Sequence, residues 1–154
     1  MNNLYFIIPE LFISLSVMAL LVLGVFKNNS SKIIFHLSCL VIIVSLAINL
    51  NINIDDTIFL FNNSYLINQL SLLIKSIILI SAFFVMFCSY SYVRLNNILK
   101  IEYPILILCS LLGMLVMISS NDLIVFYIGL ELQSLALYVL ASFKRNDQLS
   151  SESG

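Results

Sequence analysis

Glu131 is the residue of this sequence best suited to chemistry, because it lies near the middle of the last long apolar run. An acidic side chain at the centre of a membrane-spanning helix costs about 2.5 to 3.5 kcal/mol on insertion scales, so it is rarely retained without a role. Helical spacing places Tyr127, Ser134 and Tyr138 on its face, whereas Gln133 lies about 200° round the helix. We predict a protonatable site facing a bundle interior or a file of water; the alternative is a protonated carboxyl that hydrogen-bonds a neighbouring helix.

Lys75, Glu10 and His36 also lie inside apolar runs, but nearer to the ends. Lys75 is about a turn and a half inside its run, so we expect its ammonium to reach the membrane interface along its aliphatic stem rather than to relay protons. A pair with Glu131 is disfavoured, because that glutamate is far deeper. Glu10 follows Pro9 at a helix start, at a depth similar to that of Lys75, and a carboxylate there complements the helix dipole. We expect His36 to be an ordinary interfacial residue.

The remaining motifs argue against a cofactor on this chain. The sequence has no Gly-rich phosphate loop, no His-Glu-x-x-His pattern and no nucleophile elbow. Its cysteines, Cys39, Cys88 and Cys109, lie in separate apolar runs without a Cys-x-x-Cys pair, so we expect small buried hydrophobic residues rather than a metal site or a disulfide. We therefore predict neither a metal nor a redox cofactor bound to this chain.

The composition places these residues in a membrane. Of the 154 residues, 61% are hydrophobic and only 10% are charged, and the mean hydropathy is +1.08. A soluble domain carries about 25% charged residues, and a disordered chain is poor in aromatic and β-branched residues. The formal net charge of −1 gives no reason to expect a nucleic-acid partner.

Five apolar runs must position the polar residues, and each is long enough for a spanning helix. None shows the alternating pattern of a barrel strand, so we predict an all-α membrane protein with five transmembrane helices. Between the second and third runs, residues 57–61 are suited to a short β-ribbon. The predicted helices are about 4–26, 33–50, 70–91, 103–119 and 123–142.

The basic residues predict the orientation, because they accumulate on the inner side of a membrane. With the N-terminus outside and the C-terminus inside, all six loop lysines and arginines fall on the inner face, and the loop aspartates fall on the outer face. We expect Tyr5 and Tyr65 at outer helix ends, where tyrosine prefers the interface. The basic residues are Lys27, Lys32, Arg94, Lys100, Lys144 and Arg145, and the aspartates are Asp55, Asp56 and Asp122.

The stretch 112–145 resembles subunit 2 of the proton-pumping NADH:ubiquinone oxidoreductase, respiratory complex I. The early Pro-Glu-Leu-Phe at 9–12 is similar to the start of that family. The matching motifs are Leu-Gly-Met at 112–114, the Ser-Ser-Asn-Asp-Leu turn at 119–123, Glu-Leu-Gln-Ser-Leu at 131–135, Tyr-Val-Leu at 138–140 and Lys-Arg at 144–145.

The resemblance implies the first part of an antiporter-like fold, with three preliminary helices in 1–101 and the first two repeat helices plus a polar tail in 102–154. It implies that Glu131 is the acidic residue thought to modulate the pKa of a partner lysine, with Lys75, Tyr127, Ser134 and Tyr138 as possible supporting residues. Partners would be the other membrane-arm subunits and lipids. FMN, iron–sulfur clusters and ubiquinone would bind to other subunits of the enzyme, so this chain would be a non-redox subunit.

The chain departs from the family by ending at Gly154, before the helices that carry the family's central lysines. We expect the subunit to be split, with a second chain carrying those helices; the alternative is a partial sequence. Two other functions stay open: a component of a multisubunit cation/proton antiporter, and a purely structural membrane-arm subunit. The AT-rich residue usage favours a mitochondrial inner membrane, with a bacterial plasma membrane as the alternative.

Overall fold

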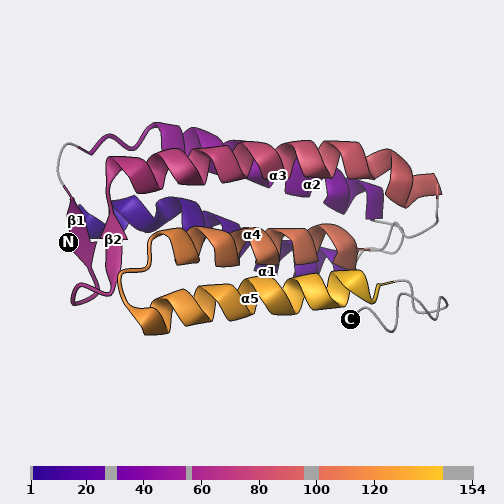
Figure 1. Cartoon of the computed structure of the whole chain (residues 1–154). Helices are drawn as coiled ribbons and strands as arrows, with labels where there is room; N and C mark the ends of the chain where they lie inside the picture. Colours follow the sequence, from indigo (N-terminus) through magenta and orange to yellow (C-terminus); the bar gives the residue numbers. More distant parts are fainter. Residues whose placement is uncertain (1, 27–30, 55–56, 96–100, 144–154) are drawn as a thin grey trace.

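The computed structural model describes residues 2–26, 31–54, 57–95 and 101–143, and these form a bundle of α-helices with a small hairpin at one end (Figure 1). Each of the five predicted apolar runs is a helix, with ends that differ from the predicted ones by a few residues at most. The elements are η1 Asn2–Ile7, α1 Ile8–Phe26, α2 Ser31–Leu50, β1 Ile58–Leu60, β2 Tyr65–Ile67, α3 Gln69–Leu95, α4 Glu102–Ile118 and α5 Leu123–Ala141.

Four of the described helices are long and apolar enough to cross a membrane: Tyr5–Phe26, Ser31–Leu50, Gln69–Ser91 and Leu123–Ala141. The fifth, α4, has 17 residues, which at about 1.5 Å each falls a few Å short of the roughly 30 Å hydrocarbon core. Five crossings and an outside N-terminus therefore stay predictions. Most of the charges behind that orientation lie outside the described residues, namely Lys27, Asp55, Asp56, Lys100, Lys144 and Arg145.

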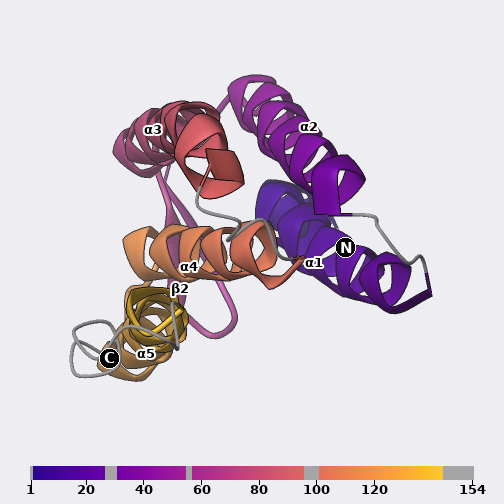
Figure 2. The ribbon, with the colours of Figure 1, turned by 90° about the vertical axis from the view of Figure 1, so that its right-hand side faces the viewer.

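The short helix α4 is nevertheless the central one, because it contacts α1, α2, α3 and α5 (Figure 2). Its buried residues include Leu108, Leu111 and Leu115, which join buried side chains of α1, α2 and α3 in the main hydrophobic core. Helix α5 lies at the edge of the bundle, and its main contact is with α4. In the most apolar stretch of α5 only 11% of the residues are buried, which is the lowest share among the four long helices.

Two glycines allow α4 and α5 to approach closely. A Cβ atom on Gly113 would lie 2.7 Å from both the Gly129 carbonyl oxygen and the Gln133 backbone nitrogen. A Cβ atom on Gly129 would lie 2.9 Å from the Gly113 carbonyl oxygen and from the Met117 nitrogen. These neighbours are backbone atoms that cannot rotate away, so contact between small residues, as in other membrane helix pairs, determines where α5 lies.

The predicted ribbon is confirmed as an antiparallel hairpin, in which Ile58 pairs with Ile67 and Leu60 with Tyr65. Its turn contains three residues with positive φ, Phe61, Asn62 and Asn63, and asparagine adopts this left-handed conformation more readily than most residues. The hairpin packs on a second, smaller hydrophobic cluster that includes Ile7, Ile52 and Ile54.

The hairpin also holds the turn between α4 and α5. The Leu66 N–H donates to the Ser119 carbonyl at 2.8 Å, and the Asn121 N–H donates to the Ser64 carbonyl at 3.0 Å. The Asn121 side chain adds a bond from Nδ2 to the Asn63 carbonyl at 2.7 Å. The beginning of α5 is therefore fixed from two sides, by α4 and by the hairpin.

Candidate functional site

The first candidate site is the α5 stripe, which comprises Tyr127, Glu131, Ser134 and Tyr138. Glu131 and Ser134 are half-buried, whereas Tyr127 and Tyr138 are 60% and 57% exposed. The Ser134 hydroxyl donates to the Glu131 carbonyl at 3.1 Å, which is a bond within one turn of the helix. The side chains of Tyr127 and Glu131 interact one turn apart.

The α5 stripe faces away from the rest of the bundle. The opposite side of α5 carries Gly129 and Ala136, which are buried, and the Gln133 backbone, which meets Gly113 of α4. Residues of the stripe lie about half a turn from these positions on an α-helix. Within the described part of the chain, the Glu131 side chain is therefore directed to a surface that no other helix covers.

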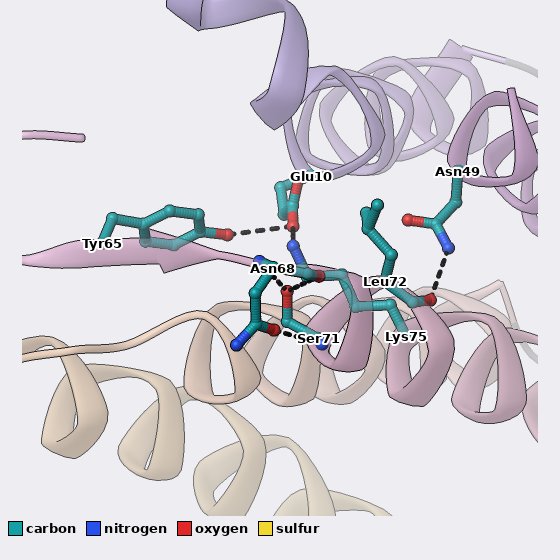
Figure 3. A network of polar contacts seen from close by, with 7 residues as sticks. All are labelled: Glu10, Asn49, Tyr65, Asn68, Ser71, Leu72 and Lys75. Carbon is teal, nitrogen blue, oxygen red and sulfur yellow. Dashed lines mark hydrogen bonds and ion pairs between the residues drawn. The ribbon is translucent and has the colours of Figure 1, made fainter. Parts of the chain in front are cut away.

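The second candidate site is the hairpin-end cluster, which comprises Glu10, Tyr65, Lys75 and Ser119. The Lys75 ammonium lies 2.5 Å from Glu10 Oε1 in a salt bridge, with side-chain exposures of 1% and 5% (Figure 3). The Tyr65 hydroxyl donates to the same carboxylate oxygen at 2.9 Å, and the Lys75 nitrogen lies 5.4 Å from the centre of the Tyr65 ring, within cation–π range. Three elements, α1, β2 and α3, thus meet at one ion pair.

The buried environment changes the acidity of Tyr65. Burial raises the pKa of the Tyr65 phenol well above its ordinary value of 10.0, and the negative charge of Glu10 raises it further. The interaction with the Ser119 hydroxyl opposes part of this rise. The phenol is therefore a hydrogen-bond donor at any physiological pH, which suits its contact with the Glu10 carboxylate.

Local sequence signals place Lys75 in the hairpin-end cluster. Asn68 caps the beginning of α3, where its Oδ1 accepts from the Ser71 N–H at 2.7 Å and its own N–H donates to Ser71 Oγ at 3.0 Å. This reciprocal arrangement is a capping box, and Lys75 follows one turn after Ser71. Asn49 of α2 adds a bond from Nδ2 to the Leu72 carbonyl at 3.0 Å (Figure 3).

The structure corrects three sequence predictions here. Lys75 does not reach the interface, because its ammonium is buried and paired. Glu10 lies in the first turn of α1, as predicted, but its main partner is Lys75 rather than the helix dipole. Tyr65 lies in strand β2 rather than at a helix end and is only 6% exposed, whereas Tyr5 is 54% exposed. The similar depth of Glu10 and Lys75 in their helices was the sequence signal that could have predicted the pair.

The two sites are separate. Lys75 is paired with Glu10, so the structure does not pair it with Glu131, in agreement with the sequence analysis. His36 is exposed, with its Nδ1 2.7 Å from the Lys32 carbonyl and its ring beside Phe35 and Tyr90. Among the described residues, the histidines, cysteines and acidic residues form no group that would hold a metal ion.

Comparisons with known proteins relate both sites to one group of relatives. The family described as NADH:quinone oxidoreductase/Mrp antiporter, TM, matches residues 120–154, which include the α5 stripe. NADH-quinone oxidoreductase subunit N of Pelagibacter ubique is 54% identical over 100% of this chain and 33% of its own length. The same subunit of Maricaulis maris is 36% identical over 99% of the chain, and that of Rhodobacter capsulatus is 36% identical over 96%. The chain spans about a third of the length of these relatives.

Proposed function

Since the chain belongs to the NADH-quinone oxidoreductase subunit N family of complex I membrane subunits, we propose that it is part of a proton-translocating membrane arm. It contributes to proton movement coupled to electron transfer from NADH to quinone. The redox groups, FMN, iron–sulfur clusters and quinone, are bound by other subunits. Its partners are those membrane-arm subunits, lipids and the part of subunit N that corresponds to the other two thirds of the relatives, as a second chain or a continuation of this one.

The observation that carries this proposal is the position of Glu131. A carboxyl halfway along an apolar helix is costly to keep, and here it lies on the uncovered side of a helix that packs mainly on α4. Among the described helices, the polar neighbours of the Glu131 carboxyl belong to the α5 stripe itself, in which the Tyr127 side chain interacts with it. The face is therefore suited to meet a partner helix, and a lysine there would load and unload a proton through its charge. Tyr127, Ser134 and Tyr138 would support hydrogen bonds around the carboxyl.

In this proposal the bundle crosses the membrane five times, with the N-terminus outside. The hairpin then lies at the outer face, together with Asp122, and the inner face carries Lys32. The relatives named above are bacterial, which favours the plasma membrane of a bacterium over the mitochondrial inner membrane.

The experiment compares Glu131→Gln with Asp122→Asn in the assembled complex. Both variants remove one carboxylate from α5 or its N-cap, but Asp122 is exposed and its side chain makes no cap bond. We expect Glu131→Gln to lower the number of protons pumped per NADH at least several-fold, because the amide cannot change charge. Asp122→Asn should pump normally. Native separation with an NADH dehydrogenase stain and mass spectrometry first establishes that each variant assembles in a large active complex.

Normal pumping by an assembled Glu131→Gln complex would contradict the relay role and support a purely structural subunit.

A second function is favoured by one finding, since the matching family includes Mrp antiporters as well as NADH:quinone oxidoreductases. For that function, the chain would run as a smaller assembly without NADH activity. Sodium-dependent proton transport in liposomes, without NADH oxidation, would then identify a cation/proton antiporter component.

A further inference from the structure

The outer side of α2 carries a continuous stripe of exposed residues, and α2 itself lies at the periphery of the bundle (Figure 2). The buried residues of α2, among them Ile34, Val41 and Ser45, share one side of the helix, and α2 packs on α1 and α3. The exposed stripe recurs every three or four residues on the opposite side, a spacing that keeps side chains on one helix face. This α2 stripe comprises Lys32, His36, Leu40, Ile43, Ala47 and Leu50.

A hollow of about 380 Å³ lies at the beginning of the α2 stripe. Its lining combines two basic side chains with three apolar ones, namely Lys32, His36, Ile33, Leu37 and Leu40. Lys32 and His36 are one helical turn apart on the same face. Among the residues that the structure describes, Lys32 forms no salt bridge, and α2 itself contains no acidic residue. The hollow is therefore suited to an anionic group attached to an apolar one.

The imidazole ring of His36 is held in place by its neighbours. Its Nδ1 lies 2.7 Å from the Lys32 carbonyl oxygen, and because a carbonyl only accepts, Nδ1 carries the hydrogen of this bond. The Tyr90 ring of α3 packs edge-on against the imidazole, with the ring centres 5.6 Å apart. A ligand in the hollow would therefore use Nε2 of His36 together with the ammonium of Lys32.

The apolar part of the α2 stripe has the length of one lipid leaflet. Leu50 follows Leu40 by ten residues, which is about 15 Å along an α-helix and about half of the roughly 30 Å hydrocarbon core. Helix α2 is itself long and apolar enough to cross a membrane. A phospholipid has the same order of parts, a charged headgroup followed by acyl chains that span one leaflet.

The side chains of the α2 stripe favour a lipid over a helix of another subunit. Closely packed membrane helices use small residues at their contact, as Gly113 and Gly129 do between α4 and α5. The α2 stripe has one small apolar residue, Ala47, between the bulky Ile43 and Leu50. A flexible acyl chain can follow such an uneven surface, whereas a rigid helix would be held away from it.

We propose that the hollow binds the phosphate of an anionic phospholipid, whose acyl chain lies along the α2 stripe. The Lys32 ammonium pairs with the phosphate, and its aliphatic stem packs on the apolar part of the lipid. His36 Nε2 donates to the phosphate when the ring is protonated and accepts from a headgroup hydroxyl when it is neutral. A zwitterionic headgroup gains less from Lys32, because it carries a cation of its own. This inference is independent of the role proposed for Glu131.

The test uses the intact assembly, purified through a tag on this chain and reconstituted in nanodiscs of phosphatidylcholine. Each sample receives a trace of phosphatidylglycerol or of phosphatidylcholine with the same photoreactive acyl chain, and mass spectrometry locates the label. We expect the phosphatidylglycerol probe to label residues 40–50 about fivefold more than the phosphatidylcholine probe does. Equal labelling by the two probes would overturn the proposal, because the stripe would then contact bulk lipid without selecting it.

Two variants connect this preference to the basic side chains. Lys32→Gln/His36→Gln removes the headgroup contacts and leaves the apolar stripe intact, so labelling by phosphatidylglycerol should decrease to the level of phosphatidylcholine. Lys32→Arg is the matched control, and it should retain most of the preference because arginine also pairs with phosphate. An undiminished preference in Lys32→Gln/His36→Gln would refute the proposal.

A cryo-electron microscopy map of the wild-type assembly in nanodiscs that contain phosphatidylglycerol gives a test without any substitution. We expect lipid density along the α2 stripe, with a phosphate oxygen within about 2.7 to 3.2 Å of the Lys32 ammonium nitrogen. A helix of another subunit over the stripe, or an acidic side chain paired with Lys32, would overturn the proposal.

Discussion

The hairpin-end cluster and the α5 stripe each contain a carboxyl group among apolar residues, but the two carboxyl groups differ in burial and in charge compensation. Glu10 is buried, faces an ammonium at 2.5 Å and accepts a bond from Tyr65. Glu131 is half-buried, and the described helices provide it with no counter-charge nearby, only with the side chain of Tyr127. A charge that is already compensated can contribute to holding helices together, whereas one without compensation is available to a partner. The first site is thus suited to structure and the second to proton transfer.

The largest expected effect comes from breaking the ion pair. Lys75→Met leaves the Glu10 carboxylate buried without its counter-ion, which costs about 3 to 5 kcal/mol. We expect the chain to dissociate from its assembly at clearly lower temperature, as measured by native separation after heating. The Glu10→Leu/Lys75→Met double variant should recover much of the loss, because apolar residues of similar size can replace a buried pair. If the destabilisation of the double variant equals the sum of the destabilisations measured for Lys75→Met and Glu10→Leu alone, the two charges are not coupled.

A somewhat smaller effect is expected from the contact that holds the α5 stripe in place. Gly129→Ala would bring its Cβ to 2.9 Å from backbone atoms of α4, so the helices must separate at a cost of about 1 to 3 kcal/mol. Gly24→Ala is the comparison variant, because the atom nearest to its Cβ, at 2.6 Å, is the Cγ2 methyl of the Ile101 side chain rather than a backbone atom. We expect Gly129→Ala to lower both the dissociation temperature and proton pumping. Equal tolerance of the two changes would mean that α4 and α5 need not be so close.

Tyr65→Phe tests the hydrogen bond in the hairpin-end cluster without removing its charges. Loss of a bond to a charged acceptor costs about 1.5 to 3 kcal/mol, and we expect the low end because the ring and its cation–π contact remain. The raised pKa of the phenol means that the folded state holds this proton more tightly than the unfolded one. Its contribution is therefore present below pH 10 and declines as the pH rises above it. The difference between wild type and Tyr65→Phe should shrink at alkaline pH in the same heating assay.

The smallest effect on stability is expected for Tyr127→Phe in the α5 stripe. This side chain is 60% exposed, and surface changes usually stay within about 0.5 kcal/mol. Its hydroxyl interacts with Glu131, so we expect a modest decrease in protons pumped per NADH with an unchanged dissociation temperature. Were the same variant to destabilise the chain while pumping stayed normal, the contrast between the two regions would be lost.

Much of the fold could be predicted from the sequence, because apolar runs of sufficient length have few alternatives in a membrane. The five helices lie where these runs are, and the ribbon at 57–61 is one strand of the hairpin. The length of α4 is a partial exception, since residues 102–118 form a helix that composition marks as spanning but that is shorter than the other four. Contacts with four neighbours, rather than length, make it central.

The candidate sites also differ in whether they depend on one segment of the chain or on contacts between distant segments. Glu131 could be identified from one helix alone, because a carboxyl amid apolar residues and the helical spacing of Tyr127, Ser134 and Tyr138 are local properties. The partner of Lys75 was not predicted, because the sequence separates Glu10, Tyr65 and Lys75 and does not say which helix faces which. The similar depth of Glu10 and Lys75 in their helices reduced the number of possible partners for Lys75. Only the packing of α1 against its neighbours brings the two side chains together.

The sequence by itself determined the membrane class, the positions of the helices and the helix face that bears Glu131, since each depends on residues within a single segment. The tertiary structure decided that Lys75 is buried rather than interfacial, that the hairpin holds the α4–α5 turn and that the Glu131 face points away from α4. These outcomes depend on contacts between distant segments, in which backbone approach at Gly113 and Gly129 and the pairing of opposite charges select one arrangement of helices.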